Sequence, residues 1–204
     1  AGPLSQWLFF GLTDAGLPAV CIETRHLKGA IGAMAANKTD RNDARAIAQV
    51  VRSGWFKAVH VKSTESQELR VLLSAREFLV NKVRDHENEI RGLLRPFGLK
   101  VGRVGAAGFE ARARELVAER PVLVLCMEAL LTAREVLRRE LNRLHLALLR
   151  GVKNDELCRR FMTIPGVGPV TALAFKTTID RPERFRRSAD VGAHLGLTPR
   201  QYQS

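Results

Sequence analysis

Residues 64–97 read TESQELRVLLSAREFLVNKVRDHENEIRGLLRPF, and this stretch decides the fold class. Its apolar residues recur at intervals of three and four, the spacing that lines one face of an α-helix. These seam residues are Leu69, Leu73, Val80, Val83, Ile90, Leu94 and Phe97. Arg76 and Glu87 interrupt the seam. The pattern predicts one long helix from Thr64 to about Pro96.

A second apolar seam follows Pro96 and the glycine-rich stretch 98–108, which interrupt the first. Its members are Leu123, Met127, Leu130, Leu137, Leu141, Leu144 and Leu148. Only Arg134 breaks this seam. The two helices favour an antiparallel, coiled-coil-like arm over residues 63–152. An ordinary helical bundle within one domain, or partner helices from another subunit, would also satisfy both stripes. Pairing with another subunit predicts a homo-oligomer, a dimer or a tetramer.

The first 62 residues show a different pattern, in which helix, strand and helix alternate. The amphipathic run 4–15 and the run 24–36 predict helices, and the short apolar run 19–22 predicts a strand. One short strand cannot form a sheet alone, so we expect the tail of an α/β domain and a chain that is a fragment at its N-terminus. The fold class expected for the chain is therefore mainly α with a partial α/β region.

Two carboxylates lie three residues apart in the run Lys38-Thr39-Asp40-Arg41-Asn42-Asp43-Ala44. Thr39 can cap a helix that begins here, and Asp40 and Asp43 would then project from one face about one turn apart. Mg²⁺ prefers carboxylate oxygens and retained water, so the pair is a candidate metal site. Acidic residues are also common in first helical turns, where they interact favourably with the helix dipole.

The segment 161–172 reads FMTIPGVGPVTA and is typical of a helix-hairpin-helix motif. Two glycines and a proline that can begin a helix would aim the amides of Gly166, Val167 and Gly168 at a phosphate. The alternative is a tight turn between helices that needs glycine only for close packing. We expect a helical domain over residues 153–204 that begins with this motif.

Arginines cluster around one aromatic residue shortly after the hairpin, in the run 180–187, DRPERFRR. Arg181, Arg184, Arg186 and Arg187 are candidate nucleic-acid contacts, since guanidinium groups bind phosphate in a bidentate manner. A solvated helix face is the alternative, because most charge clusters are no more than that.

Composition narrows the class of protein. Lys and Arg number 33 against 21 Asp and Glu, a net charge of +12 that favours a polyanionic partner, above all nucleic acid. A GC-rich genome would also enrich arginine. The three cysteines lie far apart, which argues against a disulfide framework or a zinc site and favours a reducing cytoplasm. The sequence has no apolar run of about 20 residues, so a membrane role is not expected.

Segments at the two ends of the chain together resemble one family, the IS110/IS116/IS902 group of insertion-sequence transposases. They are Asn37-Lys38-Thr39-Asp40-Arg41-Asn42-Asp43-Ala44-Arg45, Ile164-Pro165-Gly166-Val167-Gly168 and Leu195-Gly196-Leu197-Thr198-Pro199-Arg200-Gln201-Tyr202-Gln203-Ser204. Either end alone would be a weak signal. Their order, with coiled-coil-like sequence between them, matches the family over essentially the whole chain.

The resemblance implies a resolvase-like domain of the RNase H fold with four metal-binding acids in the order Asp, Glu, Asp, Asp. Asp40 and Asp43 match the third and fourth acids, whereas the first two have no counterpart here. Glu23 does not match the second acid, because it comes after the first helix of this chain, whereas the glutamate of the family precedes that helix. The same resemblance implies that Ser204, after the Thr-Pro-Arg run that holds Arg200, is the nucleophile. The alternative is a solvated loop residue, which is the more common state of a serine at a chain end. Tyr202 is an alternative nucleophile, since tyrosine also forms covalent phosphodiesters.

The resemblance thus implies a DNA transposase or site-specific recombinase that uses Mg²⁺ and a serine–DNA link and is guided by a structured RNA. A non-catalytic helical nucleic-acid-binding scaffold and a metal-dependent junction nuclease are the alternatives. We expect the chain to end before the family sequence does and, with half of its acids absent, to be inactive alone.

Overall fold

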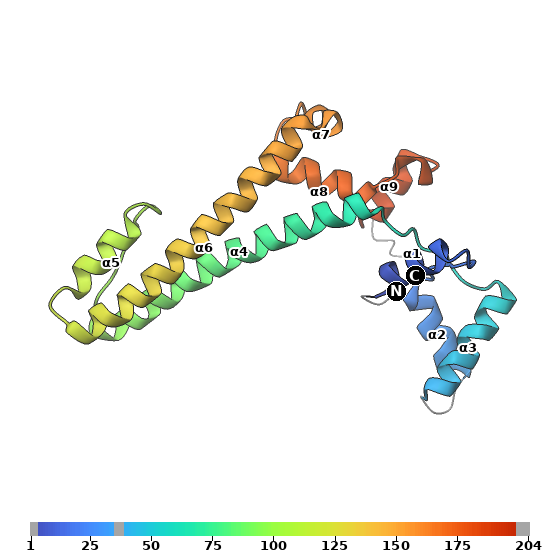
Figure 1. Ribbon diagram of the computed structural model, residues 1–204, viewed down its shortest axis with the longest axis horizontal. Coiled ribbons are helices and arrows are strands. Elements are labelled where there is room, and N and C mark those ends of the chain that lie inside the picture. The colour runs from blue at the N-terminus through green and yellow to red at the C-terminus, as the bar shows by residue number, and fades with distance from the viewer. Residues whose placement is uncertain (1–3, 35–38, 199–204) are drawn as a thin grey trace, which may run out of the picture. The chain divides into compact units, whose positions relative to one another are not determined.

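The computed structural model describes residues 4–34 and 39–198 (Figure 1). It is mainly helical, as the sequence predicts. Contacts between residues divide the chain into two units, Ala1–Ser63 and Thr64–Ser204. None of the helices in the described ranges is long and apolar enough to cross a membrane.

In the part of the first unit that the structure describes, the chain forms three helices: α1 (Ser5–Asp14), α2 (Thr24–Met34) and α3 (Asp40–Ser53). The strand predicted over residues 19–22 is reduced to one antiparallel bridge between Ile22 and Ala58. Two backbone hydrogen bonds flank this bridge: the Glu23 amide donates to the Lys57 carbonyl, and the Val59 amide to the Cys21 carbonyl. Without a further strand among the described residues, the run cannot extend into a ladder.

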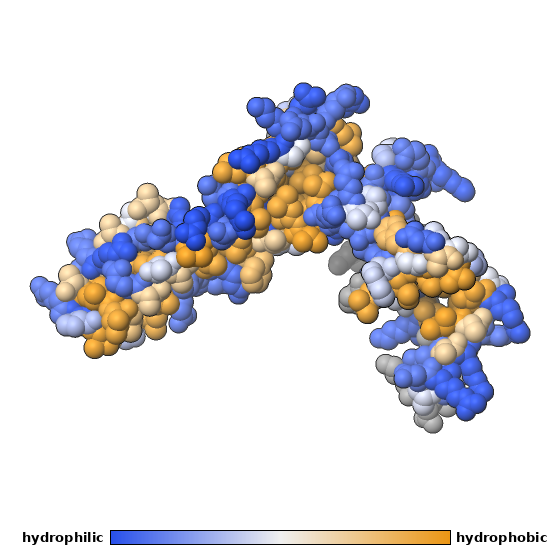
Figure 2. All heavy atoms as spheres, in the orientation of Figure 1, coloured by the Kyte–Doolittle hydropathy of each residue, from blue (hydrophilic) through white to orange (hydrophobic). Residues whose placement is uncertain are grey.

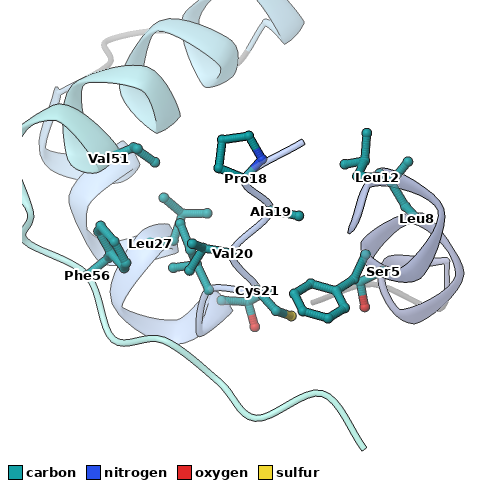
Figure 3. Close-up of a pocket in the computed structure, with 13 residues that line it drawn as sticks. Ser5, Leu8, Leu12, Pro18, Ala19, Val20, Cys21, Leu27, Val51 and Phe56 are labelled. Carbon is teal, nitrogen blue, oxygen red and sulfur yellow. The ribbon is translucent and has the colours of Figure 1, made fainter. Parts of the chain in front are cut away.

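Little of the first unit is buried. In its described part, only Ala46 and Val50 of α3 are buried apolar residues. An open cavity of about 480 Å³ lies between α1, the segment 18–22 and the side chains of Leu27, Val51 and Phe56 (Figure 3). Its lining is mostly apolar, so this unit has a loosely filled centre rather than a packed core.

The second unit is built on two long helices, α4 (Thr64–Leu94) and α6 (Pro121–Asn154), which are the two helices predicted from the apolar seams. They lie side by side and antiparallel, because the end of α4 packs with the start of α6 (Figure 1). We call this pair the arm. It joins the two ends of the unit, its tip and its base.

The tip is closed by a helix that the sequence patterns did not predict, α5 (Phe109–Val117), which follows the 3₁₀ turn η1 (Arg95–Phe97). Gly98 follows that turn with φ of 72°, a left-handed conformation that favours glycine. The tip core gathers residues from α4, α5, α6 and the loop that follows η1. It consists of Ile90, Leu94, Val101, Phe109, Ala113, Val117, Met127 and Leu131.

The base contains α7 (Glu156–Phe161), α8 (Pro169–Ile179), the 3₁₀ turn η2 (Pro182–Arg184) and α9 (Ser188–His194). Of these, α8 packs against both α4 and α6, and α7 packs against α6 and α8. The base core consists of Leu148, Val152, Cys158, Ala172 and Leu173, with Leu69, Leu72 and Leu73 of α4 against it. The predicted arm and the predicted C-terminal domain therefore lie in one unit.

Candidate functional site

The acid pair lies in the first turn of α3. Thr39 caps this helix as predicted, because its Oγ1 accepts a hydrogen bond of 3.2 Å from the Asn42 amide. Its carbonyl accepts a second bond, of 2.9 Å, from the amide of Asp43. The cap fixes where the helix begins and places Asp40 and Asp43 one turn apart on it.

The two carboxylates differ in their surroundings. Asp40 is exposed, and Asp43 is half-buried. The Oδ1 atom of Asp43 is fully covered and has no hydrogen-bond partner among the described residues. A covered oxygen without a donor is costly unless something pairs with it. This lone acceptor fits a divalent cation, and Mg²⁺ is commonly bound through one or two carboxylates and several waters.

Nothing in the described ranges completes a larger ligand set around this pair. No group of three or more His, Cys, Asp or Glu side chains close enough to share an ion occurs there. Two carboxylates can hold a metal that keeps its waters, but they do not form a closed protein cage.

The second candidate element is the hairpin between α7 and α8. Gly166 has φ of 84°, and Gly168 is extended. The Val167 amide donates to the Ile164 carbonyl at 3.1 Å, which closes the turn. Across the described residues, four amides at the start of α8 find no acceptor: those of Gly166, Gly168, Val170 and Thr171. A helix start with free amides suits an anion.

A half-buried polar contact connects the elements on either side of the hairpin. Asp155 caps α7 by accepting a 2.7 Å bond from the Cys158 amide, and its Oδ2 accepts a 2.5 Å bond from Lys176 Nζ of α8. Partial burial raises the pKa of Asp155, but the Lys176 and Cys158 donors outweigh it, and the net pKa is lowered. Asp155 raises the pKa of Lys176. Glu65 of α4 lies 3.5 Å from the same ammonium, so three elements meet here.

The thiol of Cys158 is not a candidate nucleophile. Burial raises its pKa to about 11, so it stays protonated near neutral pH.

The arginine cluster divides into two kinds of residue. Arg181, Arg186 and Arg187 are exposed and free to contact a ligand. Arg184 is half-buried: its Nε donates to the Ile179 carbonyl, and its guanidinium lies 4.2 Å from the ring centre of Phe185. Burial lowers the pKa of Arg184. The structure thus gives Arg184 a packing function in the base, which the sequence pattern did not indicate.

Two transposase families match this chain, each over a different region. Residues 1–98 match a transposase family of the DEDD IS110 type, and residues 158–204 match the Transposase IS116/IS110/IS902 family. The chain belongs to this transposase family. The acid pair falls in the first matched region and the hairpin in the second.

Individual relatives agree with the family. The transposase for insertion sequence element IS1111A of Coxiella burnetii is 34% identical over 100% of this chain and 56% of its own length. A probable family 20 transposase of Pseudomonas aeruginosa is 30% identical over 82% of the chain and 51% of its own length. The transposase for element IS1328 of Yersinia enterocolitica is 29% identical over 83% and 51%. The chain spans about half the length of these curated relatives.

Three residues that the family resemblance singles out, Arg200, Tyr202 and Ser204, lie outside the described residues.

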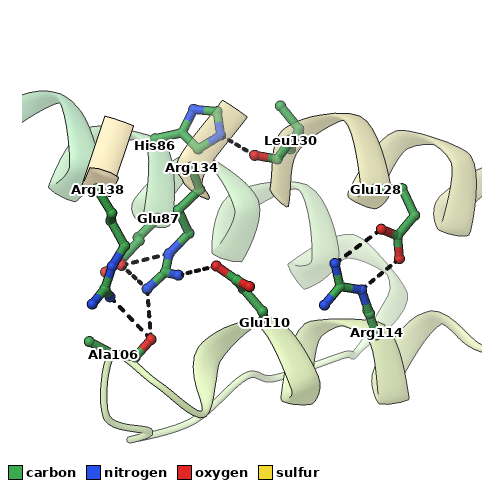
Figure 4. A network of polar contacts seen from close by, with 9 residues as sticks. All are labelled: His86, Glu87, Ala106, Glu110, Arg114, Glu128, Leu130, Arg134 and Arg138. Atoms are coloured by element: carbon green, nitrogen blue, oxygen red, sulfur yellow. Dashed lines mark hydrogen bonds and ion pairs between the residues drawn. The ribbon is translucent and has the colours of Figure 1, made fainter. Parts of the chain in front are cut away.

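Sequence reasoning missed a polar network at the tip (Figure 4). Arg134 is only 1% exposed, yet its guanidinium donates to Glu87 of α4 at 2.6 and 2.8 Å and to Glu110 of α5 at 2.7 Å. It also donates to the Ala106 carbonyl at 3.1 Å and lies 4.6 Å from the ring centre of Phe109.

The signal for this network was present in the seams. Glu87 and Arg134 are each an interruption of an apolar seam, and in the structure each is the partner of the other. A third interruption, Arg76, donates from Nε to Nδ1 of His145 at 3.3 Å. An acidic interruption in one seam and a basic one in the next was the pattern that could have predicted the pairing.

Proposed function

We propose that the whole protein is a DNA transposase that cleaves and rejoins DNA phosphodiesters, using a divalent metal and a serine nucleophile. Membership of the transposase family supports the reaction class. The single observation in the structure that carries the proposal is the acid pair, and in particular the covered, unpaired Oδ1 of Asp43.

In this proposal Asp40 and Asp43 supply two of four acids that hold Mg²⁺. When bound, the ion stabilises negative charge on the oxygens around a reacting phosphorus. The protein positions the two carboxylates. The Thr39 cap fixes the first turn of α3, and Asp43 keeps one oxygen away from solvent. The other two acids of the family pattern have no counterpart in residues 1–204.

Ser204 is the proposed nucleophile. Its Oγ forms a bond to the phosphorus as the bond from phosphorus to one DNA strand end breaks. The proton of the serine hydroxyl passes to water, and the departing oxygen takes up a proton in turn. The covalent serine–DNA link retains the energy of the phosphodiester, so attack by a new strand end rejoins DNA without an external energy source.

Binding of nucleic acid is assigned to the hairpin and its surroundings. The free amides of Gly166 and Gly168 suit a phosphate, and Val167 closes the turn that presents them. The exposed guanidinium groups of Arg181, Arg186 and Arg187 add charge beside them. Arg184 supports this region from within the base, and Arg200 is a further proposed contact.

The proposal includes two further partners. A structured guide RNA fits the net charge of +12, since RNA and DNA present the same phosphates. The second is a further copy of the chain, in a homo-oligomer (a dimer or a tetramer) whose long helices pack against one another. Val122 and Leu125 at the start of α6 are 72% and 73% exposed, an apolar surface that suits helix contacts between copies.

The test is a covalent-adduct assay. Full-length protein, Mg²⁺ and DNA carrying the element ends are incubated, denatured and separated by electrophoresis. We expect a protein–DNA adduct that Ser204→Ala and removal of Mg²⁺ abolish, that Asp43→Asn reduces by several orders of magnitude, and that Tyr202→Phe leaves intact.

Other outcomes decide between the alternatives. An adduct retained in Ser204→Ala and lost in Tyr202→Phe would transfer the nucleophile to Tyr202. Cleavage without any adduct would indicate a metal-dependent junction nuclease. Salt-dependent binding without cleavage would indicate a helical nucleic-acid-binding scaffold.

A further inference from the structure

The outer face of α6 changes character along its length. Near the tip its exposed large side chains are apolar, as described above for Val122 and Leu125. Toward the base, four cations occupy exposed positions, and we call them the basic stripe: Arg139, Arg143, Arg150 and Lys153. They are separated by four, seven and three residues, which places them on one face of the helix.

Acids are scarce around the basic stripe. Between Val136 and Asn154 no exposed position of α6 carries a carboxylate. The half-buried Glu140 contacts Arg143 at 2.7 Å and Arg139 at 3.6 Å. The other two cations of the stripe have no ion-pair partner in the part of the chain that the structure describes. The stripe is therefore a local excess of positive charge.

The partner helix of the same arm provides an internal control. Exposed charged positions of α4 hold five acids and three bases: Glu65, Glu68, Glu77, Asp85 and Glu89 against Arg70, Lys82 and Arg84. A genome that merely favours arginine codons would enrich both outer faces. The contrast between the two helices points to a charge placed on α6 for a polyanionic partner.

The position of the stripe connects it to the hairpin. Only Asp155 separates α6 from α7, where Arg159 and Arg160 are exposed, and α7 leads into the hairpin at Gly166. At 1.5 Å per residue the stripe is about 21 Å long. This length corresponds to about six base pairs of duplex DNA. Figure 2 shows hydrophilic side chains along the arm.

We propose that the basic stripe binds the phosphate backbone of duplex DNA and extends the footprint of the hairpin along the arm. This inference rests on the proposed function, because it takes DNA as the substrate. A row of cations on one helix contacts phosphates without reading bases, so the stripe sets affinity and orientation rather than sequence preference.

The experiment measures binding of the 204-residue chain to a fluorescent 30-base-pair duplex by anisotropy, over a series of salt concentrations. The stripe variant carries Arg139→Gln, Arg143→Gln, Arg150→Gln and Lys153→Gln. The matched control removes the same charge elsewhere on the second unit, with Lys82→Gln, Arg84→Gln, Lys100→Gln and Arg103→Gln. All eight positions are exposed, and circular dichroism checks that helix content is unchanged.

We expect the stripe variant to bind at least about tenfold more weakly at about 0.1 M salt. The negative slope of log K against log salt should become less steep by about 0.9 for each lost phosphate contact. The control should lose less than about threefold. Equal losses in both variants, or an unchanged slope in the stripe variant, would overturn the inference. A loss confined to duplex RNA of the same sequence would overturn it in favour of RNA.

Failure of the proposed function would look different. If the unmodified chain and the stripe variant both lack affinity for duplex DNA, the proposed function loses its DNA-binding component. If the unmodified chain binds and the stripe variant binds equally well, only the stripe assignment fails.

Discussion

The two units of this transposase-family chain differ in how many side chains they bury. In the second unit, two apolar cores lie at the ends of the arm, and a guanidinium is buried among carboxylates. In the described part of the first unit, burial is limited to Ala46 and Val50, while Trp7 and Trp55 are 74% and 68% exposed. The acid pair therefore lies on a helix with few buried residues, whereas the hairpin lies on a well-packed base.

The largest expected effect is on independent folding. Residues 64–204 should unfold cooperatively on their own, because both cores lie within them. Residues 1–63 alone should show no cooperative transition and should bind a hydrophobic dye, since they bury too little apolar surface. Urea titration of each piece, followed by circular dichroism, checks this. A sharp transition in residues 1–63 would remove the contrast between the units.

The next effect concerns the buried guanidinium at the tip. Arg134→Ala should lower the free energy of unfolding of residues 64–204 by about 3 kcal/mol, because it leaves Glu87 and Glu110 without their shared partner. Arg138→Ala is the matched control: it also donates to the Ala106 carbonyl, but from an exposed position, and should cost less than about 1 kcal/mol. Equal losses in the two variants would mean that the tip depends on packing alone.

At the base, Asp155→Ala should lower the free energy of unfolding by about 2 kcal/mol, since it removes both the α7 cap and the bond to Lys176. Asp155→Ser keeps a capping oxygen and should recover part of that loss. Urea midpoints of the two variants separate the contributions, and identical midpoints would show that the cap adds nothing.

The same contact predicts a dependence of stability on pH. A lowered pKa for Asp155 means that its contribution is present above the ordinary aspartate pKa and is lost as pH falls through the folded value. A raised pKa for Lys176 means that its contribution is lost as pH rises through its folded value. The difference in unfolding free energy between the unmodified chain and Asp155→Ala should therefore be level from about pH 5 to 9 and shrink outside that window.

The smallest effect is local and lies in the first unit. Thr39→Ala should weaken the start of α3 by about 1 kcal/mol and speed amide hydrogen exchange at Asn42, whereas Thr39→Ser should not. Exchange measured by NMR checks this. If the two variants behave alike, the hydroxyl does not hold the first turn that carries the acid pair.

Much of the second unit was predictable because its elements are long and periodic. The seams predicted α4 and α6, and the cap at Thr39 was visible in the first unit as well. The helix α5 was not predicted, although Phe109, Ala113 and Val117 recur every four residues. Three apolar residues are too few to predict a helix directly after a glycine-rich stretch.

The failures have a common physical cause. The strand predicted over residues 19–22 depends on neighbours, and one bridge at Ile22 is all that the described residues supply. Arg184 was grouped with exposed arginines, because a sequence does not show which member of a charge cluster folds back on Phe185. Local spacing predicted elements well, and it predicted poorly whatever depends on contacts between distant segments.

The bond between Glu87 and Arg134 has a further consequence for the geometry of the arm. Two helices joined only by leucine seams can slide past each other by one heptad, about 10 Å, and still bury leucine against leucine. Such a slip would leave a guanidinium facing apolar side chains, so the pairing permits a single alignment. The arm is therefore a spacer of fixed length between its tip and its base. An insertion of seven residues in one helix would need a matching insertion in the other.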